Sequence, residues 1–208
     1  MPTPTGSRWP VTLSSGDIVL RPLRYRDRNR WTAVRNANAA WLSPWEATNP
    51  VPNGQLPTYH HMVQSLKRQA RAGAALPFVI TERTPAGRHR LVGQLTVSGI
   101  TEGSALTATL GYWVAASHAG RGIAPTAVAL ATDYCFSSLG LHRMEVNIRP
   151  ENSASLRVVH KLGFRSEGVR RSFLHIGGRW ADHESFALTR EECPDGLLAP
   201  WLARQSAP

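Results

Sequence analysis

The chain has 208 residues, of which 42% are hydrophobic and 18% are charged. This length suits one domain with a sizeable core, and the composition excludes a disordered chain. Two cysteines are too few for a disulfide framework or a zinc site, so we expect reduced thiols. No apolar run has the length of a membrane span, and residues 1–10 lack the apolar core of a signal peptide. We therefore expect a cytoplasmic protein.

Positive charge dominates the chain. The formal net charge is +10, and among the 24 basic residues only Lys67 and Lys161 are lysines. Two interpretations stay open: an acidic partner such as a polyphosphate cofactor, RNA or a ribosomal surface, or an arginine-rich composition with solvated faces. The arginines over residues 21–30 alternate from a strand end into a helix, which is more typical of a solvated rim. We therefore do not expect nucleic-acid binding.

The sequence pattern divides the chain into three parts. The pattern predicts a loose leader over residues 1–15, a single domain over residues 16–190 and a tail over residues 191–208. Asp27 is expected to cap the first helix, because its carboxylate can accept from unpaired first-turn amides. Apolar periodicity and turn residues predict these elements in the first half: a strand over 17–25, a helix over 27–40, a proline-rich loop over 43–57, a helix over 58–72, and strands over 77–84, 90–100 and 105–114.

The second half alternates helices and strands. Gly140 and Gly163 are expected to end its two helices, because glycine readily adopts the left-handed conformation that closes many helices. The complete order predicts a mixed α/β fold, with helices packed on the faces of one sheet. The predicted elements are a helix over 126–139, a strand over 142–149, a helix over 153–161, and strands over 164–176 and 183–188.

A glycine turn precedes the helix over 126–139 and reads Gly-Arg-Gly-Ile-Ala at 120–124. Small residues allow close approach to a ligand, and the first turn of a helix leaves amide N–H groups unpaired at the positive end of the helix dipole. The turn therefore suits a phosphate or pyrophosphate, while many similar turns use glycine for geometry alone. Its spacing fits neither the dinucleotide-binding motif nor the P-loop.

Asn152 and Ser155 lie at the start of the helix over 153–161. The Asn152 side chain suits a helix cap, and its amide also suits the binding of a ligand amide. Ser155 lies one helical turn further on and projects to the same side. Its hydroxyl can donate a hydrogen bond to a departing anion.

Together these segments resemble the GCN5-related N-acetyltransferase (GNAT) family. The resemblance covers residues 17–190 and implies a GNAT-like fold, a central and mostly antiparallel sheet flanked by helices, with acetyl-CoA as donor and no metal. Within the family the chain is similar to the ribosomal-protein-alanine N-acetyltransferases. The matching segments are the glycine turn at 120–124, Arg-Pro-Glu-Asn-x-x-Ser at 149–155, Lys-Leu-Gly-Phe at 161–164, Leu-Gly-Tyr-Trp-Val at 110–114, Trp-Leu-Ser-Pro-Trp-Glu at 41–46 and Gly-Arg-Trp-Ala-Asp-His at 178–183.

The resemblance implies roles for particular residues. Asn152 would bond the pantetheine arm, and Ser155 would assist the leaving thiolate. Apart from the resemblance, Trp31, Trp41 and Trp45, with Tyr59, are candidates to line an acceptor groove, although tryptophans near one loop also serve simply as core. Glu46 is the one carboxylate that the early loop offers to an acceptor. The backbone expected to hold the pyrophosphate is that of Gly120, Arg121, Gly122, Ile123 and Ala124. The strand residues expected to pair with the pantetheine arm are Tyr112, Trp113 and Val114.

The chain departs from the family's pattern at two places. Ala119 stands where many members carry Gln or Arg, which removes one side chain from the pyrophosphate site. The general base is also missing, because Leu174 and Asn147 stand where relatives place a glutamate. Glu145 lies on the same strand face as Asn147, so both are kept as candidate catalytic residues beside a purely structural role. Further candidates for the base are His142, His175 and His183.

The missing base favours a particular acceptor. An α-amine with a pKa of about 8 is roughly one quarter free at pH 7.5, whereas a lysine needs about three pKa units of help. This argument favours an α-amine or another amine of lowered pKa. The resemblance to the ribosomal-protein-alanine N-acetyltransferases implies as preferred acceptor the N-terminal α-amine, with alanine first, of a ribosomal or other protein. The alternatives are a small-molecule acceptor (an antibiotic, amino acid or polyamine) and a non-catalytic acyl-CoA-binding module. We expect a monomer or homodimer.

Overall fold

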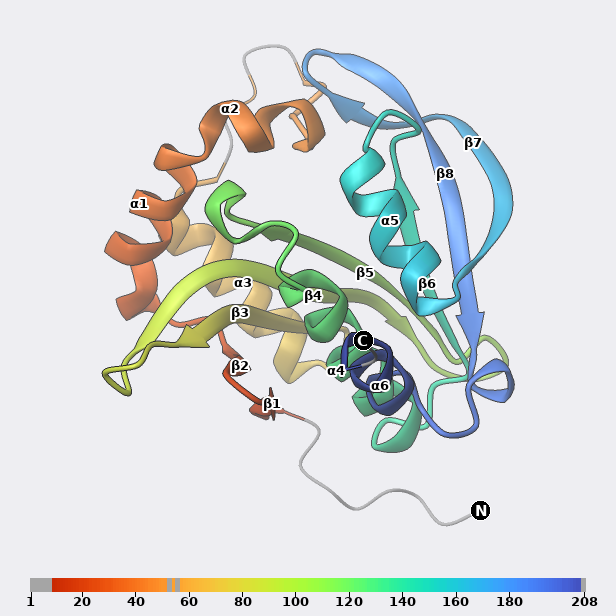
Figure 1. Cartoon of the computed structure of the whole chain (residues 1–208). Helices are drawn as coiled ribbons and strands as arrows, with labels where there is room; N and C mark the ends of the chain where they lie inside the picture. The colour runs from red at the N-terminus through yellow and green to blue at the C-terminus, as the bar shows by residue number, and fades with distance from the viewer. Residues whose placement is uncertain (1–8, 52–53, 55–56, 207–208) are drawn as a thin grey trace.

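An eight-stranded sheet forms the centre of the computed structural model, which describes residues 9–51, 54 and 57–206 (Figure 1). The strands lie in the order β1-β2-β3-β4-β5-β6-β8-β7. Neighbouring strands are antiparallel except β5 and β6, which are parallel. Their bounds are β1 Leu13–Ser15, β2 Ile18–Pro22, β3 Ala75–Arg83, β4 His89–Thr101, β5 Thr107–Val114, β6 Arg143–Ile148, β7 Arg165–Ile176 and β8 Arg179–Thr189.

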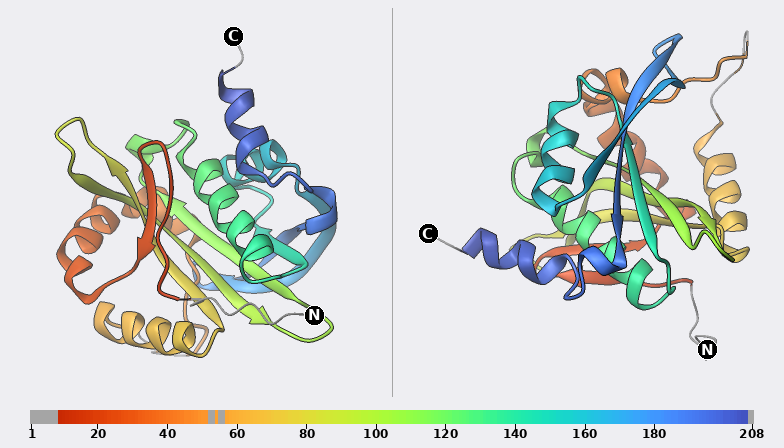
Figure 2. Two further views of the ribbon diagram at one scale, coloured as in Figure 1. Left: turned by 90° about the horizontal axis from the view of Figure 1, so that it is seen from below. Right: turned by 90° about the vertical axis from the view of Figure 1, so that its right-hand side faces the viewer.

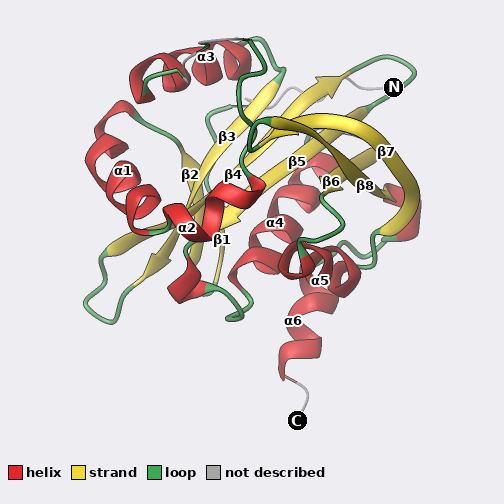
Figure 3. Ribbon diagram, turned by 90° about the horizontal axis from the view of Figure 1, so that it is seen from above, coloured by secondary structure: helices red, strands yellow, loops and turns green. Residues whose placement is uncertain are grey.

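Helices cover both faces of the sheet. Helices α1 and α3 lie on one face, and α4, α5 and α6 lie on the other (Figures 2 and 3). The mixed α/β fold expected from the sequence is confirmed. In the described part of the chain, no helix is both long enough and apolar enough to cross a membrane. The helices are α1 Arg28–Ala37, α2 Ala39–Leu42, α3 Tyr59–Arg71, α4 Ile123–Ser137, α5 Ser153–Leu162 and α6 Leu198–Ser206.

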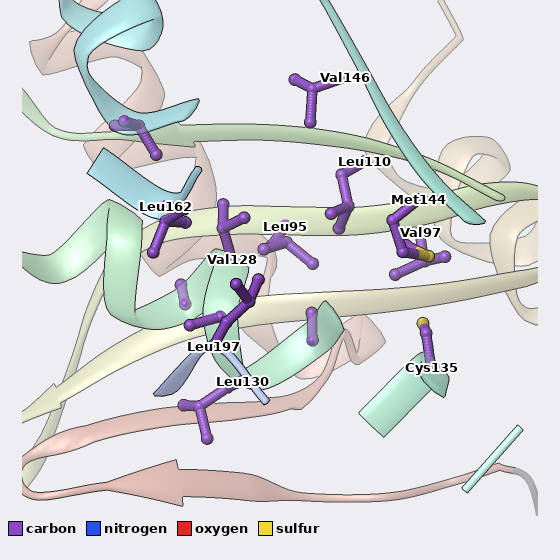
Figure 4. Packing of buried hydrophobic residues seen from close by; sticks show 14 of the residues in the cluster. Leu95, Val97, Leu110, Val128, Leu130, Cys135, Met144, Val146, Leu162 and Leu197 are labelled. Carbon is purple, nitrogen blue, oxygen red and sulfur yellow. The ribbon is translucent and has the colours of Figure 1, made fainter. Parts of the chain in front are cut away.

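The core has a large layer against α4 and a small layer against α3. Strand β3 contributes to both layers, because successive side chains of a strand point to opposite faces. Phe78 and Ile80 belong to the large layer, and Val79 packs in the small layer with Val63 of α3. Figure 4 shows part of the large layer, with Val128 of α4 against the sheet. Burial on both faces explains why β3 is an almost continuous apolar run.

Strands β5 and β6 pair over only part of their length. The pairing joins Thr107–Thr109 of β5 to Arg143–Glu145 of β6. In the described structure, β5 then continues to Val114 and β6 to Ile148 without further pairing between them. The two strands therefore part, and the edge of β5 beside the gap keeps unpaired backbone groups. This gap in the middle of the sheet positions the candidate site.

Described segments on both sides of the expected domain limits of 16–190 pack with the sheet and its helices. Residues 1–8 of the expected leader lie outside the described residues. Strand β1 lies within the rest of that expected leader and pairs with β2. The expected tail over 191–208 contains α6, whose Trp201 is buried in the large core layer. Trp201 packs through contacts with α4, which is distant in sequence, and local periodicity does not register such contacts.

Asp27 has a different role from the expected helix cap. Its two carboxylate oxygens each accept a hydrogen bond of 2.8 Å from the Arg21 guanidinium, and one also accepts from the backbone N–H of Arg24 at 3.0 Å. Burial alone would raise the pKa of this carboxyl, but the hydrogen bond and charge of Arg21 outweigh it, and the pKa is lowered. Asp27 therefore ties β2 to the turn before α1 and makes no side-chain cap bond to α1.

Gly93 sets the spacing of β4 and β5 beside the gap, and its replacement is expected to destabilise the protein. It lies opposite Val114, and a Cβ there would collide with the carbonyl oxygen of Trp113. Gly93→Ala should lower the free energy of unfolding by about 1–3 kcal/mol, as overpacked positions do. Gly111→Ala is the matched control, because its Cβ would meet nothing within 4 Å. Urea unfolding compares the two, and equal stabilities would contradict the prediction.

Candidate active site

The glycine turn precedes α4 as expected from the sequence. Gly120 and Gly122 both have a φ of +77°, a left-handed conformation that glycine adopts without strain. Helix α4 begins at Ile123, three residues earlier than predicted, so the amides of Ile123 and Ala124 belong to its first turn. First-turn amides have no carbonyl one turn earlier to bond, and the helix dipole adds partial positive charge. The turn therefore presents donors that suit a phosphate.

Helix α6 packs against this turn, which the sequence pattern does not indicate. Trp201 Nε1 donates to Thr126 Oγ1 at 2.9 Å, and this hydroxyl donates to the carbonyl of Gly122 at 2.9 Å. A Cβ on Gly122 would lie 2.8 Å from Oε1 of Gln205, so the turn and α6 approach closely. Helix α6 therefore helps to hold the backbone conformation of the turn.

The turn opens onto a cavity of about 560 Å³. Arg157 and Lys161 of α5 line the same cavity and complement a ligand with several phosphates. The Arg121 guanidinium instead donates to Glu82 of β3 at 2.6 Å, and Arg121 is not among the described residues that line the cavity. The expected cofactor residues that line this cavity are Tyr112, Trp113, Val114, Gly120, Gly122, Ile123, Ala124, Asn152 and Ser155.

The free edge of β5 faces the gap between β5 and β6. Ala115 donates its N–H to Val92 of β4 at 2.8 Å, and successive strand residues direct their backbone groups to opposite sides, so Val114 faces the gap. The Val114 carbonyl accepts from the indole N–H of Trp41 at 3.1 Å, which leaves its N–H for a ligand. By the same alternation Tyr112 also presents its backbone to the gap. Trp113 directs its backbone to β4, so only its side chain can contact a ligand there.

Ser155 and Tyr112 meet beside the gap. Ser155 Oγ donates to the Tyr112 hydroxyl at 2.8 Å and so joins α5 to β5. Asn152 caps α5, because its Oδ1 accepts from the backbone N–H of Ser155 at 3.1 Å. Burial raises the pKa of Tyr112 to about 12 against the opposing hydrogen bond from Ser155, so the phenol stays protonated near neutral pH. The sequence singles out Tyr112 for its backbone and does not reveal this pair of hydroxyls.

A second cavity of about 200 Å³ adjoins the first. The two cavities share Trp45, Ala47, Tyr112, Asn152 and Ser155. The hydroxyl pair therefore lies where the two cavities meet, which is the arrangement needed when a donor and an acceptor react. Strands β6, β7 and β8 provide further wall residues of the smaller cavity, including Asn147, Leu174 and His183.

The structure separates the two candidate catalytic residues of β6. Asn147 lines the smaller cavity and accepts a hydrogen bond from Ser185 Oγ at 2.7 Å. Glu145 is not among the residues that line either cavity, and it accepts from Arg143 at 2.8 Å and Arg170 at 3.2 Å. Its carboxylate is therefore occupied by two arginine ion pairs away from both cavities. This placement argues against Glu145 as the base.

The early tryptophans line the larger cavity, and Trp45 lines the smaller cavity as well. Trp41 and Trp45 lie in the wall of the larger cavity with Trp31 of α1. Glu46 lines it too, and its carboxylate forms an ion pair with Arg35 of α1. The Arg35 guanidinium lies 5.2 Å from the ring centre of Trp31. No spacing in the sequence links Arg35 to Glu46, because their contact depends on how α2 and the turn after it fold back toward α1.

Comparisons with known proteins agree with this geometry. The profile of the acetyltransferase (GNAT) domain matches residues 17–165. The chain is 41% identical over 103 residues to the probable N-acetyltransferase YjcK of Bacillus subtilis, a match that covers 50% of this chain and 57% of that protein. It is 26% identical over 186 residues to the ribosomal protein uS5-alanine N-acetyltransferase of Escherichia coli, covering 89% of this chain and 94% of that protein.

Among solved structures, RimJ of Mycobacterium smegmatis in complex with a CoA disulfide has a TM-score of 0.86 at 37% identity, covering 95% of this chain and 96% of that one. The ribosomal-protein-S5-alanine acetyltransferase of Vibrio fischeri shares the fold, with a TM-score of 0.75 at 23% identity over 88% of this chain and 98% of that one. The chain therefore belongs to the GNAT family of acetyltransferases. It is an N-acetyltransferase that uses acetyl-CoA.

Proposed function

We propose that the chain transfers acetyl from acetyl-CoA to the α-amine of a protein N-terminus, with alanine the favoured first residue and a cytoplasmic ribosomal protein the favoured substrate. The charge of the two cavities carries this proposal. Among the described residues that line them, Glu46 is the only carboxylate, and it is already paired with Arg35. Polyamines and aminoglycosides are polycations, and electrostatic complementarity calls for several free carboxylates to receive them.

The chemistry of the amine supports the same acceptor. An α-amine with a pKa of about 8 is partly free at neutral pH, whereas a lysine amine with a pKa of about 10.4 is almost fully charged. A site without a strong carboxylate base therefore acts more readily on an N-terminus. The cavity of about 200 Å³ beside the hydroxyl pair suits a short first side chain such as that of alanine.

The residues present fit acetyl-CoA, which carries its acetyl group as a thioester and supplies this group to the amine. We assign its phosphates to the amides of the glycine turn, with Arg157 and Lys161 beside them. The free edge of β5 pairs with the amide-containing arm. The N–H of Val114 faces the gap, where it can polarise the acetyl oxygen. When the sulfur departs, Ser155 turns its hydroxyl hydrogen from Tyr112 to the sulfur, and the protonated Tyr112 hydroxyl donates to Ser155 Oγ in return.

Three acceptors test the proposal by intact mass. The first is a lysine-free peptide that begins with alanine, the second is the same peptide with a blocked N-terminus and one lysine, and the third is spermidine. Each is incubated with the protein and acetyl-CoA, and only the first is expected to gain an acetyl group readily. Faster turnover of spermidine than of the first peptide would overturn the assigned acceptor, in favour of a small-molecule substrate.

A further inference from the structure

We propose that His183 of β8 is the general base of the transfer, taking the proton that the attacking amine loses. The proposal rests on the proposed amine transfer and adds the group that the sequence motifs leave unassigned. His183 lines the smaller cavity together with Tyr112 and Ser155. Its side chain is therefore on the acceptor side of the hydroxyl pair, and the residue as a whole is only 3% exposed.

Two contacts orient the imidazole ring. Nδ1 lies 3.1 Å from the carbonyl oxygen of Ala181, and a carbonyl can only accept, so Nδ1 carries the hydrogen and donates it. The neutral ring then has its lone pair on Nε2, the nitrogen that can accept a proton. The ring also packs edge to face against Phe173 of β7, with 5.8 Å between the ring centres. These contacts select one tautomer and hold the ring at the cavity wall.

The surroundings of His183 favour its neutral form. Burial is the largest influence and lowers its pKa, the hydrogen bond with Ala181 opposes this, and Arg149 just after β6 lowers the pKa further. Glu151 after β6 and Asp182 on β8 raise it, but the pKa stays below its usual range. The facing residue on β7 is Arg170, another cation. A neutral imidazole is ready to accept a proton at pH 7.

The other polar side chains around the smaller cavity cannot take this role. Tyr112 keeps its proton because its pKa is about 12, and Arg149 is a permanent cation. Asn147 and Asn152 have no basic nitrogen, and a serine hydroxyl such as that of Ser155 is too weak a base to hold the proton. His183 is thus the group of this cavity, within the described residues, whose protonation state suits a base.

The proton balance of the step follows from these pKa relations. A His183 with a lowered pKa is too weak to deprotonate an ammonium of pKa about 8 at equilibrium, so the acceptor reacts as free amine. As its nitrogen bonds to the acetyl carbon, it becomes positively charged and acidic, and Nε2 of His183 takes its proton. The bond from the acetyl carbon to sulfur breaks, the Ser155 hydroxyl stabilises the thiolate, and water protonates the sulfur. His183 then returns its proton to water.

The pH dependence of His183→Gln tests the proposal. At pH 8 the variant should lose roughly tenfold in kcat/KM for the alanine peptide. This loss is smaller than general bases usually cause, because water can accept the proton in place of the histidine. Between the pKa of His183 and the pKa of the amine, the logarithm of the wild-type kcat/KM should rise by one for each pH unit. Below the pKa of His183 it should rise by two for each pH unit, because both the amine and the imidazole must lose a proton. The variant should keep slope one throughout. His142→Gln, whose ring pairs with Glu191 and lines neither cavity, is the control expected to match the wild type.

A second measurement does not depend on activity. Nitrogen-15 spectra of the histidines should show His183 neutral at pH 7, protonated on Nδ1, and titrating below the usual range. An Nε2-protonated tautomer, a charged ring at pH 7, or a variant that keeps the wild-type slope change would each overturn the proposal. If the wild type acetylates spermidine but no N-terminus, the proposed acceptor fails, and the same slope test with spermidine still decides the role of His183.

Discussion

Ser155→Ala is expected to lower kcat for peptide acetylation by about 10- to 100-fold, with a smaller change in KM for acetyl-CoA. A hydrogen bond to a charged group contributes about 1.5–3 kcal/mol, and each 1.4 kcal/mol is a factor of ten in rate. The charge on sulfur develops only as the bond to carbon breaks. Loss of the Ser155 hydrogen bond to this sulfur therefore lowers kcat rather than binding. The substitution leaves helix α5 intact, because Asn152 caps the backbone N–H of Ser155 and not its side chain.

Ser153→Ala provides the matched control for this prediction. Ser153 starts the same helix, is exposed, and lines neither cavity, so its loss should leave kcat unchanged. Tyr112→Phe should share part of the Ser155 effect, because the two hydroxyls are bonded, and the double variant should show less than the sum of the two losses. Steady-state kinetics compare these four variants with the wild type. Unchanged kcat in Ser155→Ala would show that the hydroxyl does not act in the reaction.

Much of the fold follows from local pattern. Gly163 ends α5 in a left-handed conformation with φ of +80°, and the predicted strands and helices all occur with ends shifted by a few residues. The glycine turn and Asn152 are recognisable for the same reason, because a strand end, a short turn and a helix start are contiguous in sequence. Helix α4 begins earlier than its sequence predicts, because its N-cap Gly122 has no polar side chain to mark the start.

The rest of the site depends on contacts between distant segments. Tyr112 and Ser155 are 43 residues apart, and Trp41 and Val114 are 73 apart, so no periodicity connects them. Glu145 illustrates the same limit. The strand face on which Glu145 lies can be predicted. Arg170, which donates to its carboxylate, lies on β7, and β8 separates β7 from β6 in the sheet. The acceptor side of the site is built mostly from such contacts.

Trp201→Ala is expected to lower the free energy of unfolding by about 3–5 kcal/mol, the usual cost of removing a buried aromatic ring. Trp201 is 5% exposed in the large core layer between α6 and α4. Helix α6 is also anchored at its start, where the Asp133 carboxylate accepts from the N–H groups of Leu197 at 2.7 Å and Leu198 at 3.0 Å. Urea unfolding measures the loss.

Trp201→Phe and Arg204→Ala separate packing from hydrogen bonding in this helix. The phenylalanine keeps most of the buried ring but removes the N–H that holds Thr126, so it should cost about 1 kcal/mol. Because Thr126 in turn donates to the Gly122 carbonyl, this variant should also raise KM for acetyl-CoA while leaving kcat nearly unchanged. Arg204 is exposed on the same helix, and its loss should change neither quantity. If Trp201→Ala were as stable as Arg204→Ala, α6 would be an appendage, and its contact with the glycine turn could not support the cofactor site.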